Sequence, residues 1–263
     1  MIRYQKENRQ YLQSDLFCET GIVTHAFTCR KGGVSHGNIS GMNLGFRVDD
    51  NPESVMENYR LLADDLKIPM ESMVLSRQTH TDHIRPVTED DAGKGVTKPS
   101  DIYDTDALIT DRTGISLIVF SADCVPILLL DPKRRVIAAV HAGWRGTVKE
   151  IAKKTVMLMQ TKYQCDPLDI RCAIGPSIGP CCFTFGSEAT EIFPSSYCKE
   201  MEDGRFLVDI WRMNQDQLLS QGIRAEHIDL SNLCTVCHAD TFYSYRTHQE
   251  HTGRQAAAIM LRP

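Results

Sequence analysis

The apolar residues of this chain are grouped in short runs, with no long apolar stretch. The two most strongly apolar stretches are Ile115–Phe120 and Ile127–Leu130, and both fall far below the roughly 20 residues that a membrane-spanning helix needs. They are typical of buried strands, and we expect no membrane association. Runs with strand character occupy residues 22–28, 73–78, 107–110, 115–120, 125–130, 136–140, 170–174 and 256–261.

Residues 131–135, which begin Asp-Pro-Lys-Arg, are the only break between the runs at 125–130 and 136–140. So short a connection predicts an antiparallel hairpin, because a parallel crossover needs a much longer one. The pattern therefore indicates a sheet that is not purely parallel.

Three segments have helical spacing. In 51–66, Asn51 can cap, Pro52 fits the first turn, and apolar residues recur every three or four positions. The second helix is expected from Thr147, where Thr-x-x-Glu150 has the form of a capping box; its apolar face would be Val148, Ile151, Ala152, Val156 and Met159.

A third helix is expected over 209–221, with Asp209 as its cap and Gly222 closing it. Helices and strands are thus mixed along the chain, and the pattern favours an α+β fold with a mixed sheet. At 263 residues we expect one large domain over 1–263. The breaker-rich stretch Glu89–Thr105 is predicted to be a surface loop, and its composition suits an insertion as well as a linker.

The charge and the amino-terminal residues exclude some classes of protein. A net charge of -5 gives no electrostatic attraction for nucleic acid, which we do not expect as a partner. Residues 1–15 are polar and lack the apolar core of a secretory signal, so a cytoplasmic protein is expected. In that compartment the ten cysteines are expected to remain thiols or to bind metal.

Candidate chemistry is concentrated where strands end. His80 closes RQTH (77–80), Cys124 lies in the break between two apolar runs, and His141 precedes a glycine-containing turn. Two imidazoles and one thiolate suit zinc, which takes three protein ligands in catalytic sites and leaves a fourth position open. The spacing matches no compact zinc motif, however. The residues alone equally allow a buried Cys124, an exposed His80 and a hydrogen-bonded core His141.

Three longer strings resemble the signature segments of the YfiH/YlmD, or laccase-domain, family: SADCVPILLLD at 121–131, AAVHAGWRGT at 138–147 and IGPSIGPCC at 174–182. The resemblance continues through most of the chain, at 27–35, 41–50, 78–80, 106–110, 242–246 and 253–261. It implies sandwich-like mixed sheets flanked by helices, in a YfiH-like single domain. After Cys182 the chain reads Phe-Thr-Phe-Gly where many relatives carry Tyr-Glu, so roles at that position are not transferred.

The resemblance also implies a site and an activity. One zinc ion would bind to His80, Cys124 and His141, and the substrates would be purine nucleosides and phosphate. The reactions implied are phosphorolysis of adenosine, inosine and methylthioadenosine to free base and ribose 1-phosphate, and deamination of adenosine. A monomer or weak homodimer is expected.

Individual roles follow from this chemistry. Cys124, Asp123, Arg145 and Asn43 are the catalytic candidates, with Asp123 as a carrier of protons for deamination. Arg30, Arg47 and Asn43 are the candidates for binding substrate and phosphate, because guanidinium and amide groups suit an anion. The alternative for each arginine is a loop-bracing contact, and Asn43 could instead stabilise a turn.

Other functions remain open at this stage. The older family name suggests a copper polyphenol oxidase, but four copper ions need on the order of ten histidines, often in His-x-His pairs, to satisfy copper's preference for imidazole. The chain has nine histidines and no such pair. A cysteine hydrolase acting on a peptidoglycan precursor, with Cys124 as nucleophile and His141 as base, is a second alternative, with or without zinc. A zinc-stabilised binding protein is the non-enzymatic alternative.

The remaining cysteine motifs are assigned no catalytic part. Cys181 and Cys182 end the IGPSIGPCC segment, where packing explains them as well as any function. Cys234-Thr-Val-Cys237-His238 has the form of a haem attachment motif, but haem attachment is expected on exported chains. The same cluster could bind a second metal.

Overall fold

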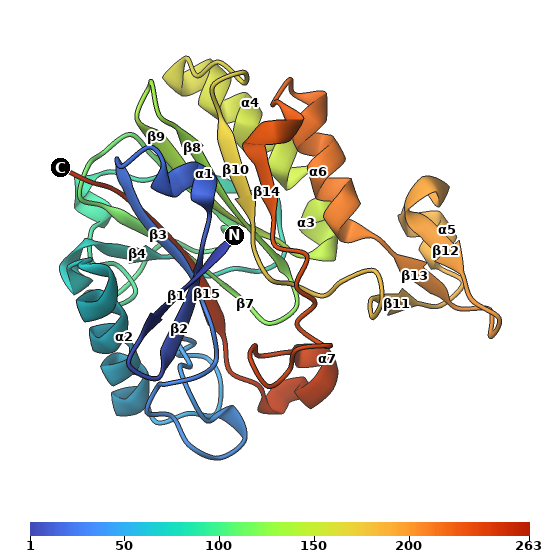
Figure 1. Ribbon diagram of the computed structural model, residues 1–263, viewed down its shortest axis with the longest axis horizontal. Coiled ribbons are helices and arrows are strands. Elements are labelled where there is room, and N and C mark those ends of the chain that lie inside the picture. Colours follow the sequence, from blue (N-terminus) through green and yellow to red (C-terminus); the bar gives the residue numbers. More distant parts are fainter.

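Two six-stranded sheets stacked face to face form the centre of the computed structural model, which describes residues 1–263 (Figure 1). In spatial order the first sheet contains β1 Ile2–Lys6, β2 Arg9–Gln13, β3 Val23–Thr28, β15 Gln255–Leu261, β7 Ser116–Ser121 and β4 Met73–Leu75. The second contains β14 Ile228–Leu230, β10 Arg171–Ile174, β8 Val125–Asp131, β9 Val136–Ala142, β6 Ala107–Thr110 and β5 Ile84–Pro86.

Both sheets are mixed. Most pairs are antiparallel, but β4 runs parallel to β7, β5 to β6 and β14 to β10. The predicted hairpin is confirmed: β8 and β9 pair antiparallel from Val125 opposite Ala142 to Asp131 opposite Val136. The hairpin stays in register because Asp131 closes the turn, accepting hydrogen bonds from the backbone amides of Lys133 and Arg134.

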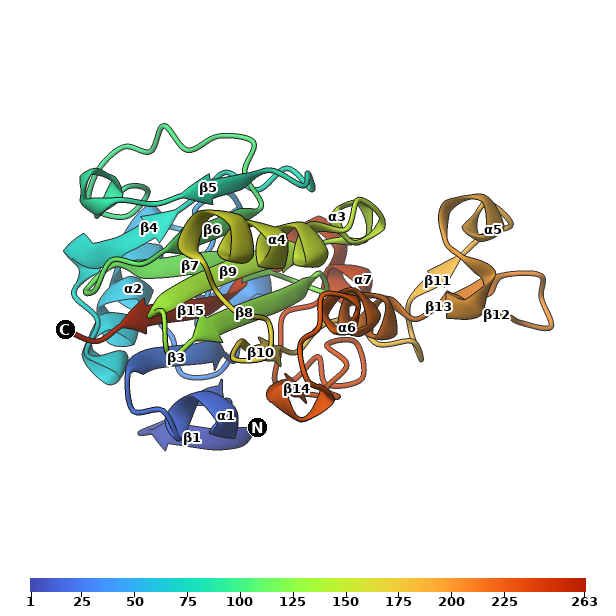
Figure 2. The same ribbon diagram turned by 90° about the horizontal axis from the view of Figure 1, so that it is seen from above.

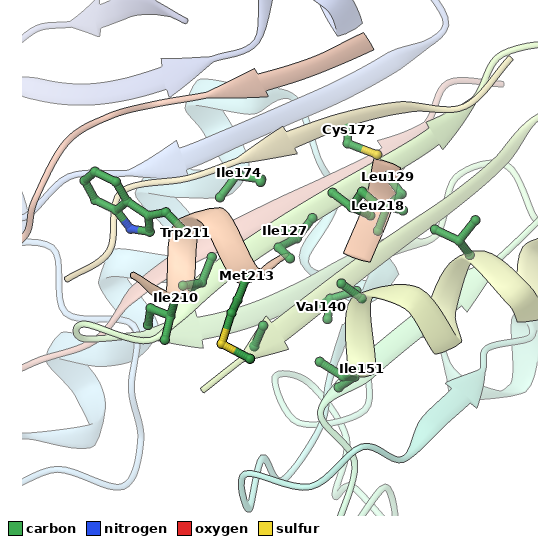
Figure 3. Packing of buried hydrophobic residues seen from close by; sticks show 14 of the residues in the cluster. Ile127, Leu129, Val140, Ile151, Cys172, Ile174, Ile210, Trp211, Met213 and Leu218 are labelled. Carbon is green, nitrogen blue, oxygen red and sulfur yellow. The ribbon is translucent and has the colours of Figure 1, made fainter. Parts of the chain in front are cut away.

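Alternate residues of β8 show how the layers are built. Leu128 and Leu130 face the first sheet, in a core that both sheets share, whereas Ile127 and Leu129 face the opposite way. That outer face is covered by α4 Ile151–Tyr163 and α6 Ile210–Ser220, whose apolar side chains pack on β8, β9 and β10 (Figure 3). On the other side of the molecule, α2 Pro52–Leu66 covers the first sheet.

The order of layers is therefore helix, sheet, sheet, helix, as the view from above also shows (Figure 2). The predicted α+β class with sandwich-like mixed sheets flanked by helices is confirmed. None of the helices combines the length and the apolar content that crossing a bilayer requires.

Two of the three predicted helices have the expected ends. The side chain of Asn51 accepts a hydrogen bond from the amide of Glu53 at the start of α2, and Asp209 accepts one from Arg212 at the start of α6. Each cap satisfies an amide that the helix itself cannot pair.

The capping box at Thr147 was wrong. Because a short helix, α3 Trp144–Val148, begins directly after β9, Thr147 already lies within a helical turn, and its amide bonds to the carbonyl of Gly143. The chain then breaks at Glu150, which has a positive φ of 62°, before α4 starts. Val148, expected to face inward, is exposed as a result.

Several further elements that were not anticipated from the sequence are short. β11 Thr184–Phe185, β13 Phe206–Val208 and β12 Cys198–Glu200 form a small sheet that projects from the main body together with α5 Ala189–Ile192 (Figures 1 and 2). α1 Asp15–Cys18 and α7 Tyr245–His248 are single turns. Six 3-10 turns complete the structure, at Gly37–Ile39, Met70–Ser72, Glu89–Asp91, Ser195–Tyr197, Ala225–His227 and Gln249–His251.

Candidate metal centre and its cavity

His80, Cys124 and His141 converge at one end of the double sheet. His80 follows β4, Cys124 lies between β7 and β8, and His141 is near the end of β9. Their potential ligand atoms all lie within 4.8 Å of one another, and Cys124 Sγ is 3.6 Å from His80 Nε2. Zinc bonds of about 2.3 Å to sulfur and 2.0 Å to nitrogen, at tetrahedral angles, require a separation of this size. The three side chains therefore form a group that could hold one metal ion.

The local backbone explains why these residues meet. The β8–β9 pairing brings Cys124, which precedes β8, beside the end of β9 that carries His141. Gly143 comes next, and a Cβ there would lie 2.7 Å from the His80 ring and 3.2 Å from Cys124 Sγ, so only glycine leaves room for the group. His80 and Asp123 both have positive φ, 63° and 90°, a region that non-glycine residues rarely occupy. Backbone strain of this kind is concentrated at functional sites.

Asp106, at the edge of β6, orients the group from behind. Its fully buried carboxylate accepts a hydrogen bond of 2.7 Å from His141 Nδ1. The same carboxylate accepts hydrogen bonds from the backbone amides of Thr79, His80 and Thr81. Burial alone would raise the pKa of Asp106, but the hydrogen bond and charge of His141 and the amides of Thr81 and Thr79 lower it. Asp106 thus fixes the tautomer of His141, leaving Nε2 for a ligand, and positions the His80 loop.

Replacement of Asp106 by asparagine is expected to weaken metal binding about tenfold, the lower end of the range for such partners, because one acceptor oxygen remains. The amide nitrogen of the asparagine cannot accept hydrogen bonds from the backbone amides of residues 79–81, so the loop that contains His80 should also become more mobile. Titration against a competing chelator measures the affinity. Unchanged affinity in a folded variant would show that Asp106 does not support the group.

The surroundings of Cys124 favour the ionised form of its thiol. Desolvation opposes its charge, but the charge of His141 and hydrogen bonds from both imidazoles outweigh that effect and lower the pKa of Cys124 to about 6. Desolvation likewise opposes charge on His141, yet Cys124 and Asp106 raise the pKa of His141 to about 9. Thiolate and imidazolium therefore stabilise each other between these values, and the thiolate is the form that binds metal.

A thiolate of this kind should be visible in alkylation of the metal-free protein. Because a lowered pKa leaves Cys124 ionised at every pH above about 6, its reaction with iodoacetamide should change little between pH 6.5 and 8. Cys18 is exposed, but partial desolvation of its thiol and the charge of Asp15 raise its pKa, so it should react about tenfold faster for each unit of rising pH. Peptide mapping after short pulses compares the two sites. Parallel pH profiles would contradict the assigned ionisation.

The group lies on the wall of a cavity of about 1080 Å³. Six arginines and one lysine line it, against the two carboxylates Asp123 and Glu188, although the whole chain has a net charge of -5. Of the six arginines only Arg205 has an ion-pair partner, Asp203. The other cationic residues of the wall are Arg47, Arg77, Lys98, Arg145, Arg246 and Arg254. Unpaired guanidinium groups around one space favour an anionic ligand.

Arg254 is the most constrained of these arginines. Its guanidinium donates hydrogen bonds to the carbonyls of Thr252 and Gly253 and has no carboxylate within ion-pair distance. Burial lowers the pKa of Arg254, because water is partly excluded from its charge. Gly45 packs against its side chain, since a Cβ at that glycine would lie 2.7 Å from Arg254 Cγ. A partly desolvated cation without a carboxylate partner is suited to binding an anion.

Arg47, expected to bind substrate or phosphate, and Arg145, expected to be catalytic, both line the cavity, and Arg145 stacks over the ring of Trp144 at 4.2 Å. Asp123 also lines it, but its two carboxylate oxygens accept hydrogen bonds of 2.6 Å from Thr235 Oγ1 and from the amide of Arg246.

The structure does not bring Arg30 and Asn43 to the cavity wall. Arg30 donates to the carbonyls of Asn38, Ser40 and Ala239 and lies over Tyr243, because the 27–42 segment folds back on itself. Asn43 is completely buried, and its side chain oxygen accepts from the amides of Gly45 and Arg254. Asn43 thus positions Arg254, and direct contact with a ligand would require it to leave these partners.

Sequence reasoning missed Asp106, Arg246 and Arg254. Each lies in a segment that carried the family resemblance, but no local pattern distinguishes it from a loop-bracing residue. The only available signal was a charged residue next to a strand: Asp106 directly before β6, and Arg254 directly before β15.

A group of three possible metal ligands on the wall of a large cationic cavity has the features of an enzyme active site, because a structural metal site would have all four coordination positions filled by protein ligands. The comparisons with known proteins agree. The chain belongs to the YfiH/YlmD, or laccase-domain, family: the family model described as multi-copper polyphenol oxidoreductase laccase matches residues 24–262.

Two curated relatives carry different names. YlmD of Geobacillus stearothermophilus, named a purine nucleoside phosphorylase, is 36% identical over 97% of this chain and 96% of its own length. RL5 from an unknown prokaryotic organism, named an adenosine deaminase, is 33% identical over 89% of this chain and 92% of its own.

Solved structures give the same result. The crystal structure of YlmD from Geobacillus stearothermophilus superposes with a TM-score of 0.92 at 34% identity, covering 100% of this chain and 99% of the other. The Bacillus licheniformis protein YfiH gives a TM-score of 0.91 at 31% identity, covering 98% of each chain.

Proposed function

We propose that the protein is a zinc-dependent purine nucleoside phosphorylase that also deaminates adenosine. The observation that carries this proposal is the unpaired arginine set around the His80–Cys124–His141 group, because side chains suited to an anion and side chains suited to a metal line the same cavity. The names of the relatives supply the substrate class.

Zinc is the metal that this donor set favours. Two imidazole nitrogens and one thiolate leave a fourth tetrahedral position, and exposed His80 leaves that side of the group open to the cavity. Bound there, zinc would supply Lewis-acid stabilisation of developing negative charge. Copper as in a four-copper oxidase is not supported, since only two of the nine histidines belong to a group that could hold a metal.

Phosphate is assigned to the arginine side of the cavity. Arg254 and Arg246 present guanidinium groups fixed by backbone carbonyls, and Arg145 is held over Trp144. Fixed donors stabilise an anion without reorganising during the reaction. Arg47 would add charge at the rim. Asn43 acts through Arg254, whose backbone amide it holds.

The purine base is assigned to the aromatic wall. Phe185 packs edge-on against Trp144 and Phe183, with ring centroids 5.7 Å and 5.0 Å apart, on the small projecting sheet. Flat apolar surfaces of this kind stack on a base. We assign Asp123 to positioning of Arg246 and of the Cys124 turn, because proton transfer by its carboxylate would require one of its two hydrogen bonds to open.

The test is incubation of metal-replete protein with inosine and phosphate, followed by chromatography. Hypoxanthine and ribose 1-phosphate should appear together and only when phosphate is present. Adenosine without phosphate should yield inosine and ammonia. Failure to release hypoxanthine from a sample with verified zinc would overturn the phosphorylase assignment.

One observation favours a second candidate, a cysteine hydrolase acting on an amide of a peptidoglycan precursor. Asp106 hydrogen-bonds His141, which in turn interacts with Cys124. The three side chains thus follow the arrangement of acid, base and nucleophile that thiol hydrolases use. Such an enzyme needs no metal. Hydrolysis of the amide that persists after complete chelation, without nucleoside cleavage, would select it.

A further inference from the structure

A second cluster of sulfur atoms lies outside the cavity wall. Cys181 and Cys182 follow β10 in the turn that ends the 174–182 segment, and Cys234 and Cys237 follow β14. The four sulfurs lie within 4.8 Å of one another, and Cys237 Sγ is 3.6 Å from both Cys181 Sγ and Cys182 Sγ. The cysteines outside this cluster and the cavity, among them Cys29 and Cys172, belong to no such group.

We propose that Cys181, Cys182, Cys234 and Cys237 form a closed structural zinc site, separate from the catalytic group. Four thiolates are a typical donor set for structural zinc, and they fill all four coordination positions, so none is left for substrate. Nothing in this assignment depends on the reaction at Cys124.

The distances fit a tetrahedral ion. Bonds of about 2.3 Å from zinc to sulfur place neighbouring sulfurs about 3.8 Å apart. Cys237 is close to this separation from two different cysteines at once. A disulfide needs about 2.0 Å between its sulfurs and can join Cys237 to one partner only, which would leave the other thiol pressed against the bond.

The backbone supplies a hydrogen-bond donor at Cys234: the amide of Gly179 donates a hydrogen bond of 3.3 Å to Cys234 Sγ. Cys234 is buried, whereas Cys181 and Cys237 are exposed, so an ion can enter from the outer side without any large movement.

The site would fasten two segments that hold the cavity in place. The amide of Ser177 bonds to the carbonyl of Leu233, and that of Thr235 bonds back to Ser177. Thr235 also donates to Asp123, next to Cys124, while Arg246 donates to the carbonyl of Cys182. Zinc between these segments would therefore brace the cavity wall from behind.

Metal content measures the proposal directly. Protein purified with zinc, desalted and analysed by elemental mass spectrometry should contain a metal ion that survives in Cys124→Ala, where the catalytic group is broken. Adding Cys237→Ala to that variant should reduce zinc from one per chain to none. Adding Cys18→Ala instead, at another exposed cysteine, should leave one. No zinc in Cys124→Ala, or zinc that survives loss of Cys237, would overturn the proposal.

X-ray absorption on the zinc form of Cys124→Ala gives the ligand set without relying on a further substitution. Four sulfur neighbours at about 2.3 Å are expected. A mixed shell of nitrogen or oxygen would contradict the site. Alkylation of the unfolded wild-type protein with chelator but no reductant should modify all ten cysteines; fewer would reveal a disulfide in place of the ion. These experiments do not involve nucleoside cleavage. A result that contradicts the structural zinc site therefore leaves the proposed function standing, and a failure of the proposed function leaves this site standing.

Discussion

Replacement of Cys124 by alanine is expected to reduce both phosphorolysis and deamination by more than about 100-fold while leaving the fold intact. Partners one step removed from a metal already cost 10- to 100-fold, and Cys124 is a direct member of the group. Cys124 lies in the loop between β7 and β8 and belongs to neither of the two largest hydrophobic clusters, so its truncation should cost little stability. Steady-state rates with inosine and with adenosine measure the loss, and thermal unfolding reports the fold.

Cys172 is the matched control for this prediction. It is fully buried on β10 and belongs to neither sulfur group, so Cys172→Ala should lower stability and leave the rate per folded molecule unchanged. The opposite pattern, with Cys124→Ala unfolded and no activity lost from its folded fraction, would assign Cys124 to structure and favour the zinc-stabilised binding protein.

Replacement of Arg254 by methionine is expected to raise the KM for phosphate about 10- to 100-fold, the range that corresponds to one hydrogen bond to a charged group. Methionine keeps an apolar stem where Gly45 packs, so the change removes charge more than volume. Deamination of adenosine uses no phosphate and should change far less. Rates at varied phosphate and fixed inosine, beside rates of deamination, separate the two effects.

Arg205→Met serves as the control, because Arg205 also lines the cavity but is already paired with Asp203. Its KM for phosphate should stay within about twofold of the original, the effect of a solvent-exposed ion pair. Equal losses in both reactions of Arg254→Met would show that this arginine shapes the cavity as a whole and does not bind phosphate.

The parts of the fold that could be predicted are those with strong local patterns. The run that forms β8 is apolar on both faces because each face packs in a different hydrophobic core. Asn51 and Asp209 are residue types that commonly cap helices, so the starts of α2 and α6 could be recognised in the sequence. β5 and β14 gave no signal, since they are three residues long and only partly buried. Thr147 and Glu150 led to a wrong prediction because a capping box and a break between two helices can contain the same residue types. The position of β9, directly before α3, determines which of the two forms.

The site shows the same division. His80, Cys124 and His141 were found through their segments, and the β8–β9 hairpin then explains the meeting of two of them. Arg254 could not be identified as a candidate anion ligand, because that assignment depends on its having no carboxylate partner in the folded structure, a property that no local pattern records. The cysteine cluster joins residues 181–182 to 234–237, so its four members become a set only when the chain is folded.

The place of β15 in the first sheet bears on how the molecule is made. This strand lies between β3 and β7, although those strands come from much earlier in the chain. Until Gln255–Leu261 leaves the ribosome, β1–β3 and β7–β4 have no strand to join them, and the neighbouring Arg254 is missing from the cavity as well. The two parts of the first sheet can therefore be joined, and the part of the cavity wall that contains Arg254 can form, only after every other strand has been made.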